Sequence, residues 1–191
     1  MPPALQATLG AHRLAGAVFA DSLWVAGEVP MQLPIIDGAL PRARLKFVAR
    51  IGPDVDPSRT EWTLEAAVFI GLELSCRPLS AINDLGPFAV ASDFGNNLGL
   101  VIGPELTNRR ERLDGIEVEA VIDGVSVGRG VSLSLAGGAL ESVRFLFEHC
   151  ARQGRPLRPG LVSTGVVQPL GQRRHRGDQP HAGRRQRVLH Q

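Results

Sequence analysis

The amino-acid sequence predicts an α+β fold that is mostly β, with few helices. Residues 44–51 and 116–122 alternate polar and apolar side chains over most of their length, which is typical of strands with one buried face. Asp123-Gly124 separates the second stretch from another alternating run, 125–129. Asp-Gly between two alternating runs is a strong signal for a tight hairpin, so these observations together predict a β-rich domain.

The first half of the chain contributes further predicted strands and a short predicted helix. Residues 16–20 (Gly-Ala-Val-Phe-Ala) resemble a strand in composition. Residues 61–70 are interpreted as a short helix with Ser58 or Thr60 as its N-cap. Residues 71–74 (Gly-Leu-Glu-Leu) then form a predicted strand.

The second half adds a buried strand, the main helix and a final short strand. Residues 98–102 are apolar and are followed by Gly103-Pro104, which we expect to close the strand. The apolar spacing within 139–153 predicts an amphipathic helix that ends at Gly154. Residues 161–165 (Leu-Val-Ser-Thr-Gly) are expected to form a short strand that ends in small polar residues.

The C-terminal residues differ in composition from the rest of the chain. Residues 168–191 hold six arginines and one acid, and no hydrophobic period. Without them 15 basic and 18 acidic residues remain, a formal charge of −3 against +2 for the whole chain. We therefore predict a domain over 1–166 and a basic tail over 167–191. The tail is disordered, a nucleic-acid-binding arm or an out-of-frame translation; the acidic body argues against nucleic-acid binding by the domain.

The start of the chain and the cysteines bear on the compartment. No basic region followed by an apolar stretch comes after Met1, and no apolar run approaches the roughly 20 residues that span a bilayer. We therefore expect a cytoplasmic protein without a membrane partner. Cys76 and Cys150 have no metal-type spacing, and the simplest interpretation is two buried thiols without a disulfide.

Standard nucleotide-binding, hydrolase and metalloprotease motifs are missing, but an ordered series of segments resembles a known family. The family is the fumarylacetoacetate hydrolase family, in its 2-keto-4-pentenoate hydratase and 4-oxalocrotonate decarboxylase branch. The resemblance covers about residues 4–166, and six segments carry it: 4–10 with 16–21, 42–48, 71–74, 91–103, the Asp123-Gly124 hairpin with Gly137-Gly138, and 154–165.

This resemblance implies a mixed, strongly bent β-sheet or β-roll of the family's C-terminal-domain type. It also implies a hydratase-type lyase of aromatic-compound catabolism, acting on a 2-keto-4-enoic acid, and a homo-oligomer or a subunit paired with a paralogue. In this family Mg²⁺ or Mn²⁺ holds the 2-keto acid and stabilises its enolate, because a hard dication polarises the keto group.

The expected metal ligands are mostly replaced. Where the family strand carries Glu-x-Glu, this sequence has Arg42 and Arg44, and guanidinium groups cannot ligate a cation. Glu73 matches a further metal-binding glutamate of the family; the alternative is an ordinary acid paired with Arg77. Arg42 and Arg44 either bind an anionic keto acid directly, since arginine suits carboxylates, or face solvent on an exposed strand.

Three other residues match family positions that line the substrate. Asp21 is a candidate acid/base group, with a turn aspartate before Ser22 as the alternative. Ser163 is a candidate catalytic and substrate-binding residue, and Thr164 a second candidate for the substrate carboxylate; the alternative is a polar strand terminus. Asp93 is interpreted as organising its turn, with a catalytic role as the alternative.

Compared with the family, the chain starts after a helical region and a Gly-Tyr-Lys-like strand, and its end diverges after Gly165. Three hypotheses follow: a hydratase, a catalytically impaired or non-catalytic partner subunit of the same family, or a β-rich binding module with a basic tail.

Overall fold

The computed structural model describes residues 6–7, 10, 13–29, 31–34, 36–37, 39–56, 67–77, 79, 81–107, 116–122, 125–131, 141–165 and 168–169. Within them the chain is mostly β with two α-helices, as the sequence predicts. The elements are the short 3-10 turn η1 (Ala20–Ser22), β1 (Leu23–Val25), β2 (Leu40–Ile51), β3 (Ala67–Arg77), α2 (Pro87–Ser92), β4 (Asn97–Glu105), β5 (Glu117–Ile122), β6 (Val125–Val131), α3 (Glu141–Arg152), β7 (Gly160–Ser163) and β8 (Gln168–Pro169).

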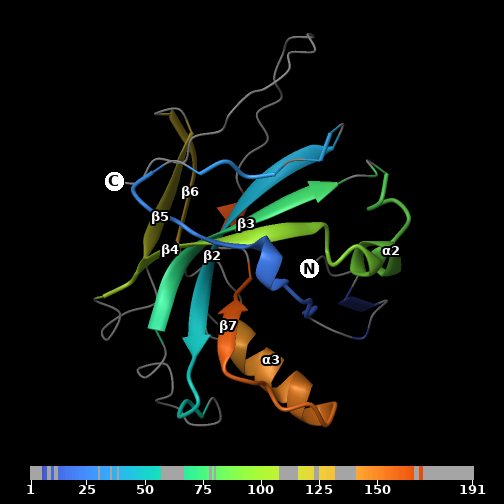
Figure 1. The fold of residues 1–191 in the computed structure, drawn as a ribbon. Coiled ribbons are helices and arrows are strands. Elements are labelled where there is room, and N and C mark those ends of the chain that lie inside the picture. Colours follow the sequence, from blue (N-terminus) through green and yellow to red (C-terminus); the bar gives the residue numbers. More distant parts are fainter. Residues whose placement is uncertain are drawn as a thin grey trace.

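One curled, mixed sheet forms the centre of the molecule (Figure 1). Its strand order is β1-β4-β3-β2-β7, and β8 pairs with β2. β1 runs parallel to β4, whereas the other neighbouring strands are antiparallel. β5 and β6 form a separate two-stranded ribbon. The mixed, bent sheet agrees with the coarse fold class expected from the sequence.

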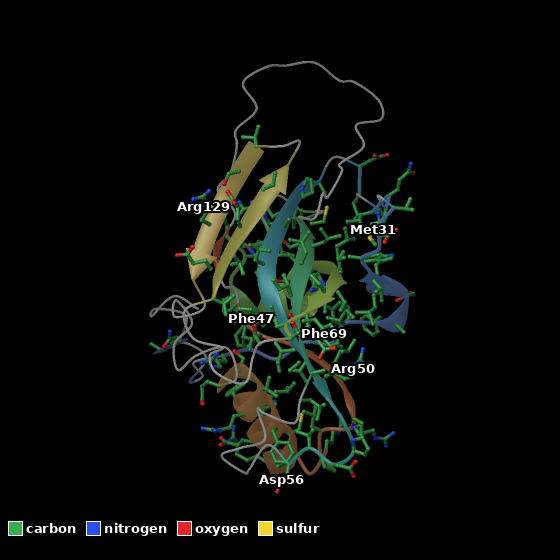
Figure 2. All side chains as sticks on the ribbon, turned by 90° about the vertical axis from the view of Figure 1, so that its left-hand side faces the viewer. Met31, Phe47, Arg50, Asp56, Phe69 and Arg129 are labelled. Carbon is green, nitrogen blue, oxygen red and sulfur yellow. The ribbon has the colours of Figure 1, made fainter. Side chains whose placement is uncertain are left out.

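The face of the sheet that carries the odd-numbered residues of β2 packs on two covers. Leu45 and Phe47 form a core cluster with Val68 and with Val118 of the β5–β6 ribbon. A second cluster joins β2 and β7 to α3 and contains Ala49, Ile51, Val143 and Val162. Figure 2 shows Phe47 on the side of the sheet that faces β5 and β6, and Phe69 with Arg50 on the other side. This face of β2 is therefore buried in the hydrophobic core.

The opposite face is divided along its length. One half is apolar, with Val48, Phe69, Leu100 and Ile102 in a buried cluster. Arg50 lies over the Phe69 ring at 4.8 Å. The other half carries the charged residues of β2 and β3, because side chains two residues apart on a strand share a face. That charged half holds most of the residues singled out from the sequence.

Several predicted elements are confirmed. The predicted strands 44–51, 71–74 and 98–102 lie within β2, β3 and β4, and 161–163 of the predicted strand 161–165 lie in β7, which ends at Ser163. The predicted hairpin is β5–β6, whose turn residues 123–124 lie outside the described residues. The predicted helix is α3, and Gly154 ends it with φ +66°, a left-handed conformation that suits glycine.

Three expectations need correction. Residues 67–70 of the predicted helix belong to β3, because they pair along β2 from Phe47 to Arg50 and this pairing overrides local helix propensity; 61–66 lie outside the described residues. Residues 16–20 do not form a strand; the strand begins at Leu23, where pairing with β4 begins.

β4 does not end at Gly103-Pro104 but continues to Glu105 through a register shift against β3. A side chain at Gly103 would lie 2.9 Å from the carbonyl oxygen of Ile70, so glycine permits the close approach. The predicted division at residue 167 stays a prediction, although Gln168 and Pro169 pair with β2.

Candidate functional site

The β2–β3 register brings three of the predicted site residues together. Arg44 lies opposite Glu73, and Arg42 lies opposite Ser75. Lys46 follows two residues after Arg44 and so extends the same row of side chains. Directly opposite residues of an antiparallel pair have neighbouring side chains, so the strand after Pro41 and the strand of Glu73 build one surface. We call this surface, made of Arg42, Arg44, Lys46, Glu73, Ser75, Arg77 and Asn97, the cationic face.

Glu73 is bound by two neighbours on this face. Lys46 Nζ lies 2.7 Å from Glu73 Oε2, and the two side chains are only 10% and 13% exposed. Oε2 has no aligned hydrogen bond, so the contact acts through charge. Asn97, the first residue of β4, donates its Nδ2–H to Glu73 Oε1 at 3.2 Å. Glu73 is therefore paired with Lys46, where the sequence had left Arg77 as the alternative partner.

These residues do not fit a Mg²⁺ or Mn²⁺ ion. Both oxygens of Glu73 already face a cation or a donor, and the guanidinium groups of Arg42 and Arg44 lie on the same face. Within the described residues no group of three His, Cys, Asp or Glu side chains is positioned to hold a metal. Mg²⁺ requires an octahedron of oxygens, which one neutralised carboxylate cannot supply.

Arg44 and Arg77 both lie close enough to Arg42 to act on it electrostatically. Burial of the Arg42 side chain lowers its pKa, and the charges of Arg77 and Arg44 lower it further. In the described part of the chain none of the three guanidinium groups has a carboxylate at ion-pair distance. Arg77 Nε is buried there without a hydrogen-bond partner. Among the described residues, four cationic side chains therefore lie on a face with one carboxylate, Glu73, which is already paired with Lys46.

Thr164 and Ser163 lie at the end of β7, away from the cationic face. Thr164 Oγ1 accepts the backbone N–H of Phe47 at 3.1 Å and donates to the Gly165 oxygen at 3.1 Å, and the residue is 4% exposed. Both hydrogen-bonding roles of this hydroxyl are thus met within the protein. Ser163 lies opposite Val48, four residues along β2 from Arg44, which is roughly 13 Å at the rise of a strand.

Asp21 and Ser163 lie at opposite edges of the sheet, beside β1 and on β7. It is exposed in η1, directly before β1, and Ser22 Oγ donates to its Oδ1 at 3.4 Å. β4 and β3 separate β1 from β2, so three strand spacings, roughly 14 Å, lie between β1 and the strand of Arg42 and Arg44, and β7 with Ser163 lies one strand further. The structure therefore brings together Arg42, Arg44 and Glu73, but places Asp21, Ser163 and Thr164 elsewhere.

Lys46, Arg77 and Asn97 are site residues that the sequence patterns do not assign. Lys46 carried a usable signal, because it shares the alternation of Arg42 and Arg44 and must therefore share their face. Asn97 follows a turn in which the backbone N–H of Asn96 donates to the Asp93 oxygen at 2.8 Å. Asp93 thus takes part in the turn that it was expected to organise. Only the β3–β4 register makes Asn97 a neighbour of Glu73.

No protein-family model matches this chain, and no curated protein matches it either. None of the described helices has the length and apolar character that crossing a membrane requires. Cys76 is buried and Cys150 half-buried, and both thiols are free.

Proposed function

We propose that the cationic face binds a small organic anion of the 2-keto acid class, and that it does so without a metal ion. The observation that carries this proposal is the excess of positive charge. The charges of Arg44 and Arg77 both act on Arg42, while Glu73, the one carboxylate of this face among the described residues, is held by Lys46. An anionic ligand would relieve this repulsion.

Arginine is suited to this task. The guanidinium group presents donors in a planar fork that matches the two oxygens of a carboxylate, and it remains charged even when its pKa is lowered. Arg42 and Arg44 are half-buried on the sheet, so their hydrogen bonds to an anion would be only partly screened by water. Lys46 is paired with Glu73, so the arginines supply the positive charge that is left for a ligand.

The resemblance noted in the sequence supports the choice of a 2-keto acid over other anions. We also propose that the bent sheet is of the fumarylacetoacetate hydrolase C-terminal-domain type, and that this chain is a catalytically impaired relative of the hydratases. The substitution of two family carboxylates by arginine supports that view, because it replaces groups that bind a cation with groups that bind an anion.

Calorimetric titration with pyruvate tests the binding proposal. We expect binding that EDTA does not change, and roughly tenfold or greater weakening in Arg42→Gln/Arg44→Gln, because a hydrogen bond to a charged group contributes about 1.5–3 kcal/mol. Arg129→Gln is the matched control, since Arg129 lies on β6 and pairs with Glu119 at 3.0 Å. Unchanged affinity in the double variant would contradict the proposal.

The metal-free character has its own test. We expect no tight Mn²⁺ binding by the native chain in calorimetry, and measurable Mn²⁺ binding once glutamate replaces Arg42 and Arg44, because three carboxylates would then share one face. Hydratase activity remains the competing prediction. Incubation with 2-hydroxypenta-2,4-dienoate and Mg²⁺ should leave the dienoate absorbance unchanged, and a Mg²⁺-dependent loss would overturn the metal-free proposal.

A further inference from the structure

The loop between α2 and β4 connects the cationic face to an exposed aromatic pair. Phe94 and Phe19 meet edge to face, with ring centroids 5.1 Å apart. They are 52% and 51% exposed, so much of both rings faces solvent. Asn97, three residues after Phe94, contacts Glu73 of the cationic face. Three residues of chain span at most roughly 10 Å, which places the aromatic pair at the same end of the sheet as the arginines.

A second link joins this loop to Arg77. Cys76, the residue before Arg77, donates its backbone N–H to the Asn96 oxygen at 3.0 Å. The loop that carries Phe94 is thereby fastened to the end of β3 where the cationic face ends. Phe94 is thereby held two residues from a backbone contact with the neighbour of Arg77.

The backbone of this loop is strained. Phe94, Gly95 and Asn96 all have positive φ, at 48°, 76° and 62°. A positive φ is common for glycine and tolerated by asparagine, but unusual for a bulky aromatic residue. Residues in such conformations persist where the surrounding structure holds them, and they gather at binding sites. In this left-handed conformation the Phe94 side chain remains exposed to solvent.

We infer that the ligand of the cationic face carries an aromatic or similarly flat apolar tail, which packs on the Phe19–Phe94 pair while its carboxylate binds the arginines. This inference rests on the proposed function, because the anion site supplies the charged anchor. The chemical class is an aryl-substituted 2-keto acid, with phenylpyruvate as the probe. A third ring added to an edge-to-face pair gains both burial and favourable ring geometry.

The test compares pyruvate with phenylpyruvate by calorimetry on the full chain. We expect the native protein to bind phenylpyruvate roughly three- to tenfold more tightly. Phe94→Asn should abolish this preference and retain pyruvate binding, because asparagine tolerates the left-handed backbone at this position. Phe88→Ala is the control, since Phe88 on α2 is 72% exposed and takes no part in the aromatic pair.

The outcomes separate the two proposals. Equal affinities for both acids, or a preference that persists in Phe94→Asn, overturn the aromatic tail and leave anion binding intact. Binding of neither acid overturns the proposed function and this inference together. Circular dichroism of each variant identifies any loss of affinity that comes from unfolding.

Discussion

Lys46→Met is expected to destabilise the protein by about 3–5 kcal/mol, because it leaves the Glu73 carboxylate buried without its cation. The two side chains are 10% and 13% exposed, so little water is available to replace the ammonium group. Methionine has a similar length, which limits the effect of lost packing. Urea unfolding followed by circular dichroism measures the change in the free energy of unfolding.

Two further variants separate charge from packing. Lys46→Met/Glu73→Gln removes both charges, and we expect it to recover most of the loss, because replacing both partners is far less costly than removing one. Arg152→Met breaks the exposed pair with Glu148 on α3 and should change stability by less than about 0.5 kcal/mol. A loss below about 1 kcal/mol in Lys46→Met, or simple additivity in the double variant, would show that the buried pair is not coupled as described.

Gly99→Ala is expected to cost about 1–3 kcal/mol through overpacking. A Cβ atom at Gly99 would lie 2.5 Å from the carbonyl oxygen of Ser22 and would also meet the Trp24 ring. The oxygen belongs to the backbone and cannot rotate away, so β1 would have to move from β4. The loss should appear as a lower midpoint of urea unfolding with an unchanged slope.

Gly27→Ala provides the matched comparison for this substitution. Nothing lies within 4 Å of a Cβ atom at Gly27, and its φ is not in the left-handed region. Alanine there reduces the freedom of the unfolded chain, so we expect stability to be unchanged or raised by up to about 1 kcal/mol. Equal effects of the two substitutions would mean that the approach of β1 to Gly99 does not limit stability.

Local patterns were sufficient to predict most of the elements. The alternation in 44–51 reflects a real division between the core face and the charged face of β2, and α3 follows from apolar spacing and Gly154. The helix predicted for residues 67–70 is wrong, because these residues form a strand through their pairing with Phe47 to Arg50 of β2. Where a strand is stabilised mainly by pairing with a distant strand, its own residues do not reveal it.

The candidate site was predictable only in part for the same reason. The sequence singled out Arg42, Arg44 and Glu73 separately, yet nothing local indicates that Arg44 lies opposite Glu73. The pairing of Lys46 with Glu73 depends on the reach of a lysine side chain across two strands. Strand register, which is decided by the whole sheet, therefore determined whether the carboxylate was available to a metal or already neutralised.

The pairing of strands that are far apart in the sequence affects how fast the protein folds. Leu23 pairs with Leu100, and Val48 pairs with Ser163, so sheet neighbours are separated by 77 and 115 residues of chain. Closing such large loops costs entropy before any contact compensates for it, and domains dominated by distant contacts fold slowly. During synthesis β2 cannot pair with β7 until β7 has left the ribosome. Until then the edge of β2 is unpaired, and another chain can add a strand to it.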